Sequence, residues 1–556
     1  MASQIIVGDV YYLVCEQLRR RSDVSAFMRS SRSFHPLGVT RLLKMGVYIS
    51  TSKELVSFYQ FMKRNFIDKR KTARQLTELT IAVDWDEDRR DAMAADMSSD
   101  CESMQDLPSR ASLLIPVLGC VTNLQRLAID FCEIFLECDD QLGHAIASLT
   151  TLRELHIKCH GICTYELVAN LRSSLRKVHV DFGDEVPNQP GEDHVPDLLD
   201  PLRMLLPHQG TLLEVTIHAA DLAERLLTPN GYIFPQVHTL VLKRCQVTAR
   251  EVIMNAFPNV NRLELFCVEV GNGQEDPPVD VDEVRAVNLA YPKQWAPLDF
   301  VYANVDSLFT LGFRSRVGRL DVALWEFKEV DIEHLRMVLA DVQPRRLVVQ
   351  WGYWDAYLEL STEFSPERLG KLFVGVDERV INEITHFGLD LGLKNLTEDP
   401  ALYKVCASLS CRTHCTNHYS HNDKDAVAQL LATLLHVRCF AFRLHAVARE
   451  YEDDFANATP EDREDDTVDT VEVLAAGFGD EVLAALATQI AATAQSVTLL
   501  CFFVMSRRVF WRVARDAGGS LTRIGEEEGE RLMAAEGMRW HCPSKIWWPG
   551  NPEYDE

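Results

Sequence analysis

The sequence lacks any apolar stretch long enough to cross a membrane. A membrane-spanning helix needs about 18–20 consecutive apolar residues, and the strongest candidate here, Val497–Val504, is far shorter. The N-terminal segment also lacks the hydrophobic core of a secretory signal, because Asp9 and Arg19–Arg21 interrupt its apolar residues. We therefore expect a protein of the cytoplasm or nucleus that has no membrane partner and keeps its fifteen cysteines as free thiols.

Motifs of well-known catalytic or cofactor chemistry are missing as well. The chain has no G-x-S-x-G nucleophile turn and no H-E-x-x-H zinc helix. Gly271 and Gly273 lie in an acidic turn, whereas a phosphate-binding loop would join a strand to a helix. The 82 Asp and Glu residues are too numerous for one pair to stand out as acid and base. We expect a protein without catalytic activity and without a cofactor.

One segment does concentrate residues that are able to bind a metal. It contains Cys406, Cys411, His414, Cys415, His418 and His421. Thiolates and imidazoles are the usual ligands of zinc, but the spacing C-x4-C-x2-H-C lacks the paired Cys-x-x-Cys of zinc knuckles. A surface loop with incidental polar residues is the simpler interpretation, and a zinc-dependent enzyme is the alternative.

Charge is distributed unevenly along the chain. The whole sequence has 57 Lys and Arg against 82 Asp and Glu, a net charge of −25. Its first 75 residues nevertheless carry fourteen basic and five acidic side chains, a balance of +9, which leaves −34 for the remainder. An acidic body repels nucleic-acid phosphates, which argues against nucleic acid as the main ligand. The basic N-terminal segment suits an acidic partner.

The segment from Ile6 to Leu43 has the pattern of three short amphipathic helices. The apolar face of the first comprises Val10, Leu13, Val14 and Leu18. Asp9 is placed to cap this helix, and Ser22-Asp23 offers a second helix start. Because fewer than about 40 residues cannot bury a sufficient core alone, these helices must pack on something else. The segment is therefore predicted to be a docking module.

These residues resemble an F-box, the adaptor-binding motif of SCF-type ubiquitin ligases. The family's opening Leu-Pro corresponds to Ile6-Val7, so valine stands where the family has proline. Its Asp-Leu pair resembles Asp23-Val24, and its small-basic-aromatic signature resembles Ser31–Phe34. The resemblance implies a Skp-type adaptor and, through it, a cullin–RING ligase as partners. The implied contact residues are Ile6, Val7, Val10, Val14, Leu18, Val24, Phe27 and Phe34.

A strand-like pattern, L-x-x-L-x-L, recurs after this head. Its copies start at Leu124, Leu152, Leu175, Leu212, Val237, Val260 and Val284. The starts lie 28, 23, 37, 25, 23 and 24 residues apart, which is typical of leucine-rich repeats. In two copies Cys132 and Cys245 occupy the position where that repeat places a small buried residue after the strand. Beyond Leu289 the spacing is irregular. Further copies are expected from Val317, Leu369, Ile384, Val437 and Val497.

We therefore predict an α/β fold in which a short helical F-box-like head precedes an irregular leucine-rich-repeat solenoid. A parallel sheet would line the concave face of the solenoid, and helices would cover its convex face. The expected organisation is a head at 1–46, a first repeat with a linker helix at 47–75, the solenoid at 76–545 and a tail at 546–556, with acidic insertions near 84–106 and 450–469. The tryptophans Trp540, Trp547 and Trp548 are expected to cover the last strand edge.

This order of elements is similar to that of fungal F-box proteins. It implies a non-catalytic substrate-recognition subunit, whose repeats bind an unidentified protein target. We expect the target to be basic and to bind polar strand positions that face outward. Those positions are Gln125, Arg153, Glu154, His156, Glu214, His238, Glu264 and Glu269. The alternatives are an interaction scaffold that binds no adaptor, and the zinc-dependent enzyme mentioned above.

Overall fold

The structure is a computed structural model. It describes residues 2–83, 110–158, 161–182, 200–222, 231–247, 249–270, 280–324, 329–351, 371–393, 430, 433–446, 479–504, 507–516 and 519–540. The fold is mixed α/β with mostly parallel strands, as predicted. The chain divides into two compact units, the first built mainly from Met1–Val247 and the second mainly from Val260–His541.

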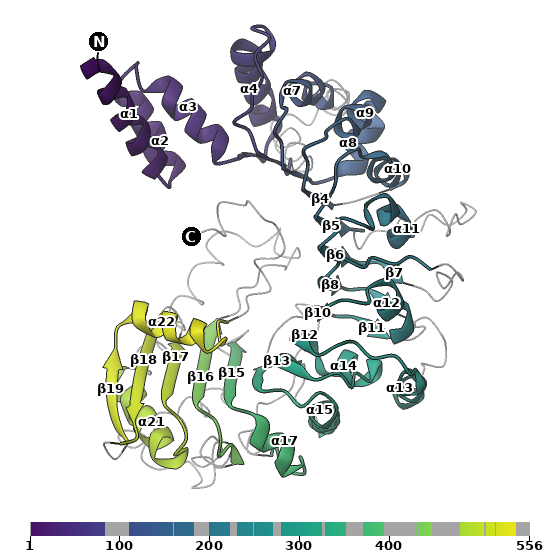
Figure 1. Cartoon of the computed structure of the whole chain (residues 1–556), viewed down its shortest axis with the longest axis vertical. Coiled ribbons are helices and arrows are strands. Elements are labelled where there is room, and N and C mark those ends of the chain that lie inside the picture. Colours follow the sequence, from purple (N-terminus) through teal and green to yellow (C-terminus); the bar gives the residue numbers. More distant parts are fainter. Residues whose placement is uncertain are drawn as a thin grey trace, which may run out of the picture. The chain divides into compact units, whose positions relative to one another are not determined.

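Three helices open the first unit (Figure 1). They are α1 (Ala2–Gln17), α2 (Arg21–Ser30) and α3 (His35–Lys44). The prediction of three helices is confirmed, but Asp9 lies inside α1 and does not cap it. The physical reason is at position 7. A proline there would remove an amide donor and favour a helix start, whereas Val7 lets the helix continue from Ala2.

The predicted first repeat follows directly. The segment 47–75 contains β1 (Val47–Ile49), α4 (Ser52–Met62) and a π-helix (Lys63–Ile67), and β2 (Glu78–Ile81) comes after it. The start of α4 has two capping bonds. The Thr51 hydroxyl accepts from the Glu54 amide at 3.2 Å, and the Glu54 carboxylate accepts from the amide of Ser50, the residue before the N-cap, at 2.8 Å. The N-cap Thr51 therefore marks where α4 begins.

Five more parallel strands continue the sheet of the first unit. They are β3 (Arg126–Ile129), β4 (Glu154–Lys158), β5 (Lys177–Asp181), β6 (Glu214–His218) and β8 (Thr239–Lys243). The second apolar position of each repeat forms one row across these strands. The row is Leu79, Leu127, Leu155, Val178, Val215 and Leu240. Its members are at most 2% exposed, which confirms the predicted burial of Leu155 and Leu240.

Helices and sharp turns join these strands. The helices are α7 (Leu114–Cys120), α8 (Cys132–Cys138), α9 (Asp140–Ala147), α10 (Ile162–Asn170), α11 (Pro201–Leu205) and a 3-10 turn (Leu206–His208), and Figure 1 shows α7 to α11 along one side of the strands. Ala219 and Arg244 follow β6 and β8 with φ of 54° and 47°, a left-handed conformation that turns the chain sharply. Short paired strands come next, β7 (Asp221–Leu222) and β9 (Gln246–Val247). Cys132 and Cys245 are fully buried, and burial raises the pKa of each thiol to about 12.

The second unit continues the strand-and-helix alternation. Its strands are β10 (Arg262–Phe266), β11 (Glu269–Val270), β12 (Leu298–Asn304), β13 (Val317–Leu324), β14 (Arg346–Trp351), β15 (His386–Leu393), β16 (Cys439–Ala446), β17 (Leu499–Val504), β18 (Arg507–Ala514) and β19 (Ser520–Ile524). Its helices are α12 (Arg250–Ala256), α13 (Val281–Ala290), α14 (Val305–Leu311), α15 (Glu329–Val342), α17 (Glu378–Glu383), α21 (Asp480–Thr493) and α22 (Glu526–Ala535). Leu263 is fully buried, as predicted, and strands form after Val260, Ile384, Val437 and Val497 and from Val317. Leu369 lies outside the described residues.

Two features of the second unit differ from the prediction. The copy expected from Val284 is helix α13, which Asp280 caps by accepting from the Asp282 amide at 2.9 Å, and whose buried side chains are Arg285 and Asn288. Val287, expected in a strand core, is 67% exposed. The sheet also ends antiparallel, with β18 pairing β17 and β19 pairing β18. Both connections are short, and antiparallel pairing is the only pairing that such turns allow.

We predict that Leu155→Ala lowers the free energy of unfolding of the first unit by about 2–5 kcal/mol, because it leaves a cavity in the central apolar row. Urea denaturation followed by circular dichroism measures this change. Ile162→Ala is the matched control, since Ile162 is 49% exposed at the start of α10. Equal midpoints for the two variants would contradict the repeat assignment.

Candidate docking surface and the outward faces of the sheets

Helix α1 presents an uncovered apolar run. Val10, Leu13 and Val14 are 51%, 61% and 45% exposed, and Tyr11 and Tyr12 between them are exposed too. Neighbouring exposed apolar side chains of this kind mark binding surfaces or aggregation sites. The predicted contact residues Val10 and Val14 therefore lie on an open surface. Sequence reasoning missed the two tyrosines. The signal for them was five consecutive apolar or aromatic residues, which one face of a helix cannot bury.

The remaining predicted contact residues are divided between the surface and the small core of the head. Val24 is fully buried, so it stabilises the head and is not available to an adaptor; this part of the prediction was wrong. Phe27 and Phe34 stack at 4.5 Å between ring centroids, and both are half-buried, as is Leu18. Backbone positions of Ile6 and Val7 fall within α1, but their side chains lie outside the described part of the structure.

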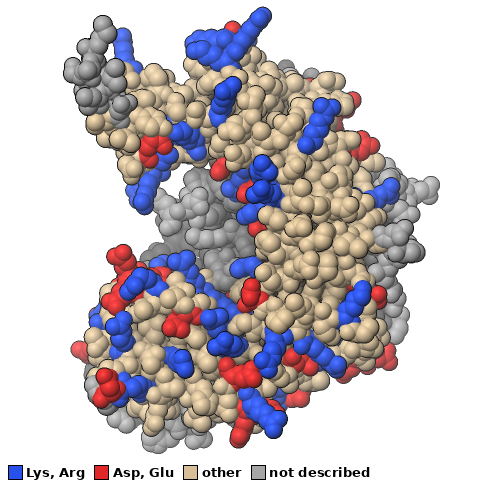
Figure 2. Space-filling model, viewed as in Figure 1, with Lys and Arg blue, Asp and Glu red and all other residues tan. Residues whose placement is uncertain are grey.

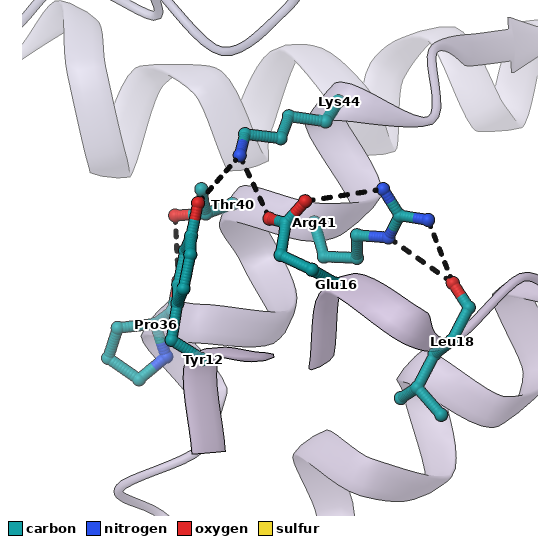
Figure 3. Close-up of polar contacts among 7 residues, drawn as sticks. All are labelled: Tyr12, Glu16, Leu18, Pro36, Thr40, Arg41 and Lys44. Carbon is teal, nitrogen blue, oxygen red and sulfur yellow. Dashed lines mark hydrogen bonds and ion pairs between the residues drawn. The ribbon is translucent and has the colours of Figure 1, made fainter. Parts of the chain in front are cut away.

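Polar contacts hold α1 against α3 (Figure 3). The Lys44 ammonium donates to the Glu16 carboxylate at 2.8 Å and to the Tyr12 hydroxyl at 3.1 Å. The hydrogen bond from Lys44 lowers the pKa of Glu16, and the same bond raises the pKa of Lys44. Arg41 donates to the Leu18 carbonyl at 2.9 and 3.2 Å and pairs with Glu16 at 3.6 Å. These contacts fix the C-terminal half of α1 while its apolar run stays open.

In the first unit the outward row of the sheet alternates in charge. It runs Glu78, Arg126, Glu154, Lys177 and Glu214 on five neighbouring strands. Arg126 lies 3.8 Å from Glu78 and 3.9 Å from Glu154, and Lys177 lies 3.2 Å from Glu214. Opposite charges facing each other across strands stabilise a sheet modestly. Because the charges offset one another, this row does not by itself select a partner of one sign.

Further along the same strands the outward positions hold buried and half-buried polar side chains. The imidazoles of His156 and His179 lie 5.5 Å apart, and the His218 ring bonds the Asp181 carboxylate at 2.5 Å. Burial, reinforced by the Lys243 ammonium, lowers the pKa of His179 to about 3. Burial also lowers the pKa of His156 well below its ordinary value. Both histidines are therefore neutral in the folded protein at physiological pH.

In the second unit the chain's own C-terminal part covers the outward side of the sheet. Helix α22 packs on β18 so closely that a Cβ at Gly529 would lie 2.1 Å from the Phe510 ring. The chain then crosses to β13 and β14. Arg319 donates to the Gly537 carbonyl at 2.9 Å, and Arg346 donates to the Glu536 carbonyl at 2.7 Å. Outward positions of these strands are therefore occupied and are not open to a target.

Two predicted positions need correction on this side of the sheet. Glu264 was expected to face a partner, but it is 2% exposed and pairs with Arg262 at 2.7 Å within β10. Trp540 was expected at the last strand edge. Its ring instead contacts Phe503 at 5.9 Å and lies 5.8 Å from the Arg443 guanidinium, on the face of the sheet. Trp547 and Trp548 fall outside the described residues.

The candidate metal ligands Cys406, Cys411, His414 and Cys415 also lie outside the described residues, as do the acidic segments 84–106 and 450–469. In the described ranges no group of three or more His, Cys, Asp and Glu side chains is arranged to hold a metal ion. Nor does any helix there combine the length and apolarity that crossing a membrane requires. Comparison of the sequence with models of known protein families and with curated proteins finds no match.

We predict that acid destabilises the first unit through His179. Its folded-state pKa is lower than its unfolded value, so the unfolded state binds the extra proton and stability falls as pH drops below about 6.5. His179→Gln should make the fall in unfolding free energy shallower by about 1.4 kcal/mol per pH unit. Urea titrations at several pH values between 7.5 and about 4.5 test this. The exposed His144, changed to Gln, is the control, and an unchanged slope in His179→Gln would contradict the assignment.

Proposed function

We propose that the chain is a non-catalytic substrate-recognition subunit of an SCF-type E3 ubiquitin ligase. In this function α1 binds a Skp-type adaptor, and the repeats bind a protein target. The observation that carries the proposal is the open apolar run of α1 around Val10, Leu13 and Val14, held in place by the bonds from α3. The F-box-like pattern in the sequence supports the same conclusion.

Energetics are compatible with such docking. Burying a fully exposed Val or Leu side chain is worth about 1.5–3 kcal/mol. A few side chains of this kind on α1 can offset the translational and rotational cost of association and still leave micromolar binding. The bound target would then be held near the ubiquitin-conjugating enzyme at high effective concentration. This function requires no catalytic group in this chain.

The repeats would form a leucine-rich-repeat solenoid, with the sheet on its concave face. Regular apolar rows and the left-handed residues after β6 and β8 support this architecture. For the target, the open outward positions are those of the first strands, where Glu78 and Lys177 are 50% and 46% exposed. A basic target remains our proposal, and the acidic segments would supply its attraction. The cytoplasm or nucleus is the compartment where such a ligase would act.

A second function, an interaction scaffold that binds no adaptor, is favoured by one observation. Helix α1 begins at Ala2 and passes through Val7, so it lacks the proline-set helix start that the F-box family uses. A pull-down from cell extract with and without residues 1–46, analysed by mass spectrometry, separates the two functions. Adaptor and cullin recovered only with residues 1–46 support the ligase subunit, whereas a target recovered without either supports the scaffold.

We predict that Val14→Asp reduces affinity for a purified Skp-type adaptor by at least about a hundredfold, because the interface would have to bury an unpaired carboxylate. Isothermal titration calorimetry measures the change. Val14 is exposed in the free protein, so the unfolding midpoint should stay unchanged. Ile162→Asp is the control, since it places the same charge at an exposed apolar site on α10. Adaptor binding that survives Val14→Asp would refute the proposed contact.

A further inference from the structure

A dense group of cations lies on the π-helix and the turn that follow α4. Six exposed basic side chains occur within twelve residues, accompanied by one exposed carboxylate, Asp68. They are Lys63, Arg64, Lys69, Arg70, Lys71 and Arg74, named here the cationic turn. Figure 2 shows the corresponding concentration of blue surface over α4 and the turn beside it. This surface plays no part in the α1 contact proposed above.

The backbone of the cationic turn is well defined. Amides of Asp68 and Lys71 donate to the carbonyls of Lys63 and Phe66 at 3.0 and 2.9 Å, and Arg70 has a left-handed φ of 51°. Ala73, only 1% exposed, donates its amide to the Cys120 carbonyl at 3.0 Å. The ammonium and guanidinium groups are thus presented from a folded support, so less conformational entropy is lost when a ligand binds.

The charges of the turn are not compensated locally. Across the described ranges none of the six forms an ion pair with a carboxylate, and Lys63 instead lies over the Tyr59 ring at 5.8 Å. This contrasts with the sheet of the same unit, where Arg126 and Lys177 face glutamates. Like charges within one Debye length, about 8–10 Å, repel one another. An anionic partner would relieve that repulsion.

We propose that the cationic turn binds an acidic protein segment. The charge of the rest of the chain argues against nucleic acid as the ligand of this turn. The sequence beyond residue 75 carries a net charge of −34, so a long polyphosphate that extends past the turn would be repelled. A short stretch rich in Asp and Glu contacts the turn alone. Alternate carboxylates of an extended peptide lie about 6.6 Å apart on one side, close enough to reach several of these flexible cations.

The test uses the intact chain and a fluorescent decaglutamate peptide, with decaglutamine as the neutral reference. At about 50 mM salt, decaglutamate should bind at least about tenfold more tightly than decaglutamine, and its affinity should fall steeply as salt rises. The combined variant Lys69→Glu, Arg70→Glu and Lys71→Glu should lose at least about tenfold in affinity for decaglutamate. Fluorescence anisotropy measures each dissociation constant.

A matched triple variant controls for net charge. Arg153, Arg172 and Arg176 are also exposed in the same unit, and changing them to Glu alters the total charge by the same amount. This control should change affinity less than about twofold. Equal losses in both triple variants, or no preference for decaglutamate over decaglutamine, would overturn the proposal. Tighter binding of an oligothymidylate of equal charge would replace it with nucleic-acid binding. Val14→Asp should retain decaglutamate binding, so this proposal and the adaptor proposal fail separately.

Discussion

The first unit depends on the burial of one row of apolar side chains that lie opposite one another on neighbouring strands. Leu127, Leu155 and Leu240 lie on different strands, yet each is shielded completely by its neighbours in the row and by the helices behind it. Each strand buries its apolar side only against the neighbouring strands and the helices that pack on them. The pairing is parallel, so a long connection must return the chain to the starting end of the sheet after each strand, and such a connection is usually a helix. The outward positions are then left for polar side chains.

The side chains at the outward positions of the strands make different contacts in the two units. In the first unit they form an alternating charge row and a buried histidine group, in which His179 stays neutral because its surroundings disfavour a proton. In the second unit Arg319 and Arg346 bind carbonyl groups of the chain's own C-terminal part. A sheet face that looks uniformly available in a repeat pattern is therefore open only in places. Binding by the proposed receptor would have to use the open part or the connecting loops.

The two N-terminal surfaces differ in physical character. Helix α1 offers exposed apolar area around Leu13, whose removal from water is the driving force. The cationic turn after α4 offers charge on a fixed backbone, and its interactions weaken with salt. Such a combination suits two different contacts on neighbouring segments, one apolar and one electrostatic. The polar bonds of Arg41 and Lys44 keep α1 in place without covering its apolar run.

Local patterns in the sequence predicted the main strands of the first unit and the three helices of the head, because apolar periodicity and capping act over a few residues. They also identified Val10 and Val14 as an apolar helix face. Only the tertiary structure showed that Val24 is buried, that the copy from Val284 is a helix, and that residues 536–537 lie on the sheet. The physical reason is that three apolar positions within six residues are too permissive a pattern to specify a strand. Whether a strand or a helix forms, and which of its faces stays exposed, depends on contacts between residues far apart in the chain. Local sequence patterns do not specify those contacts.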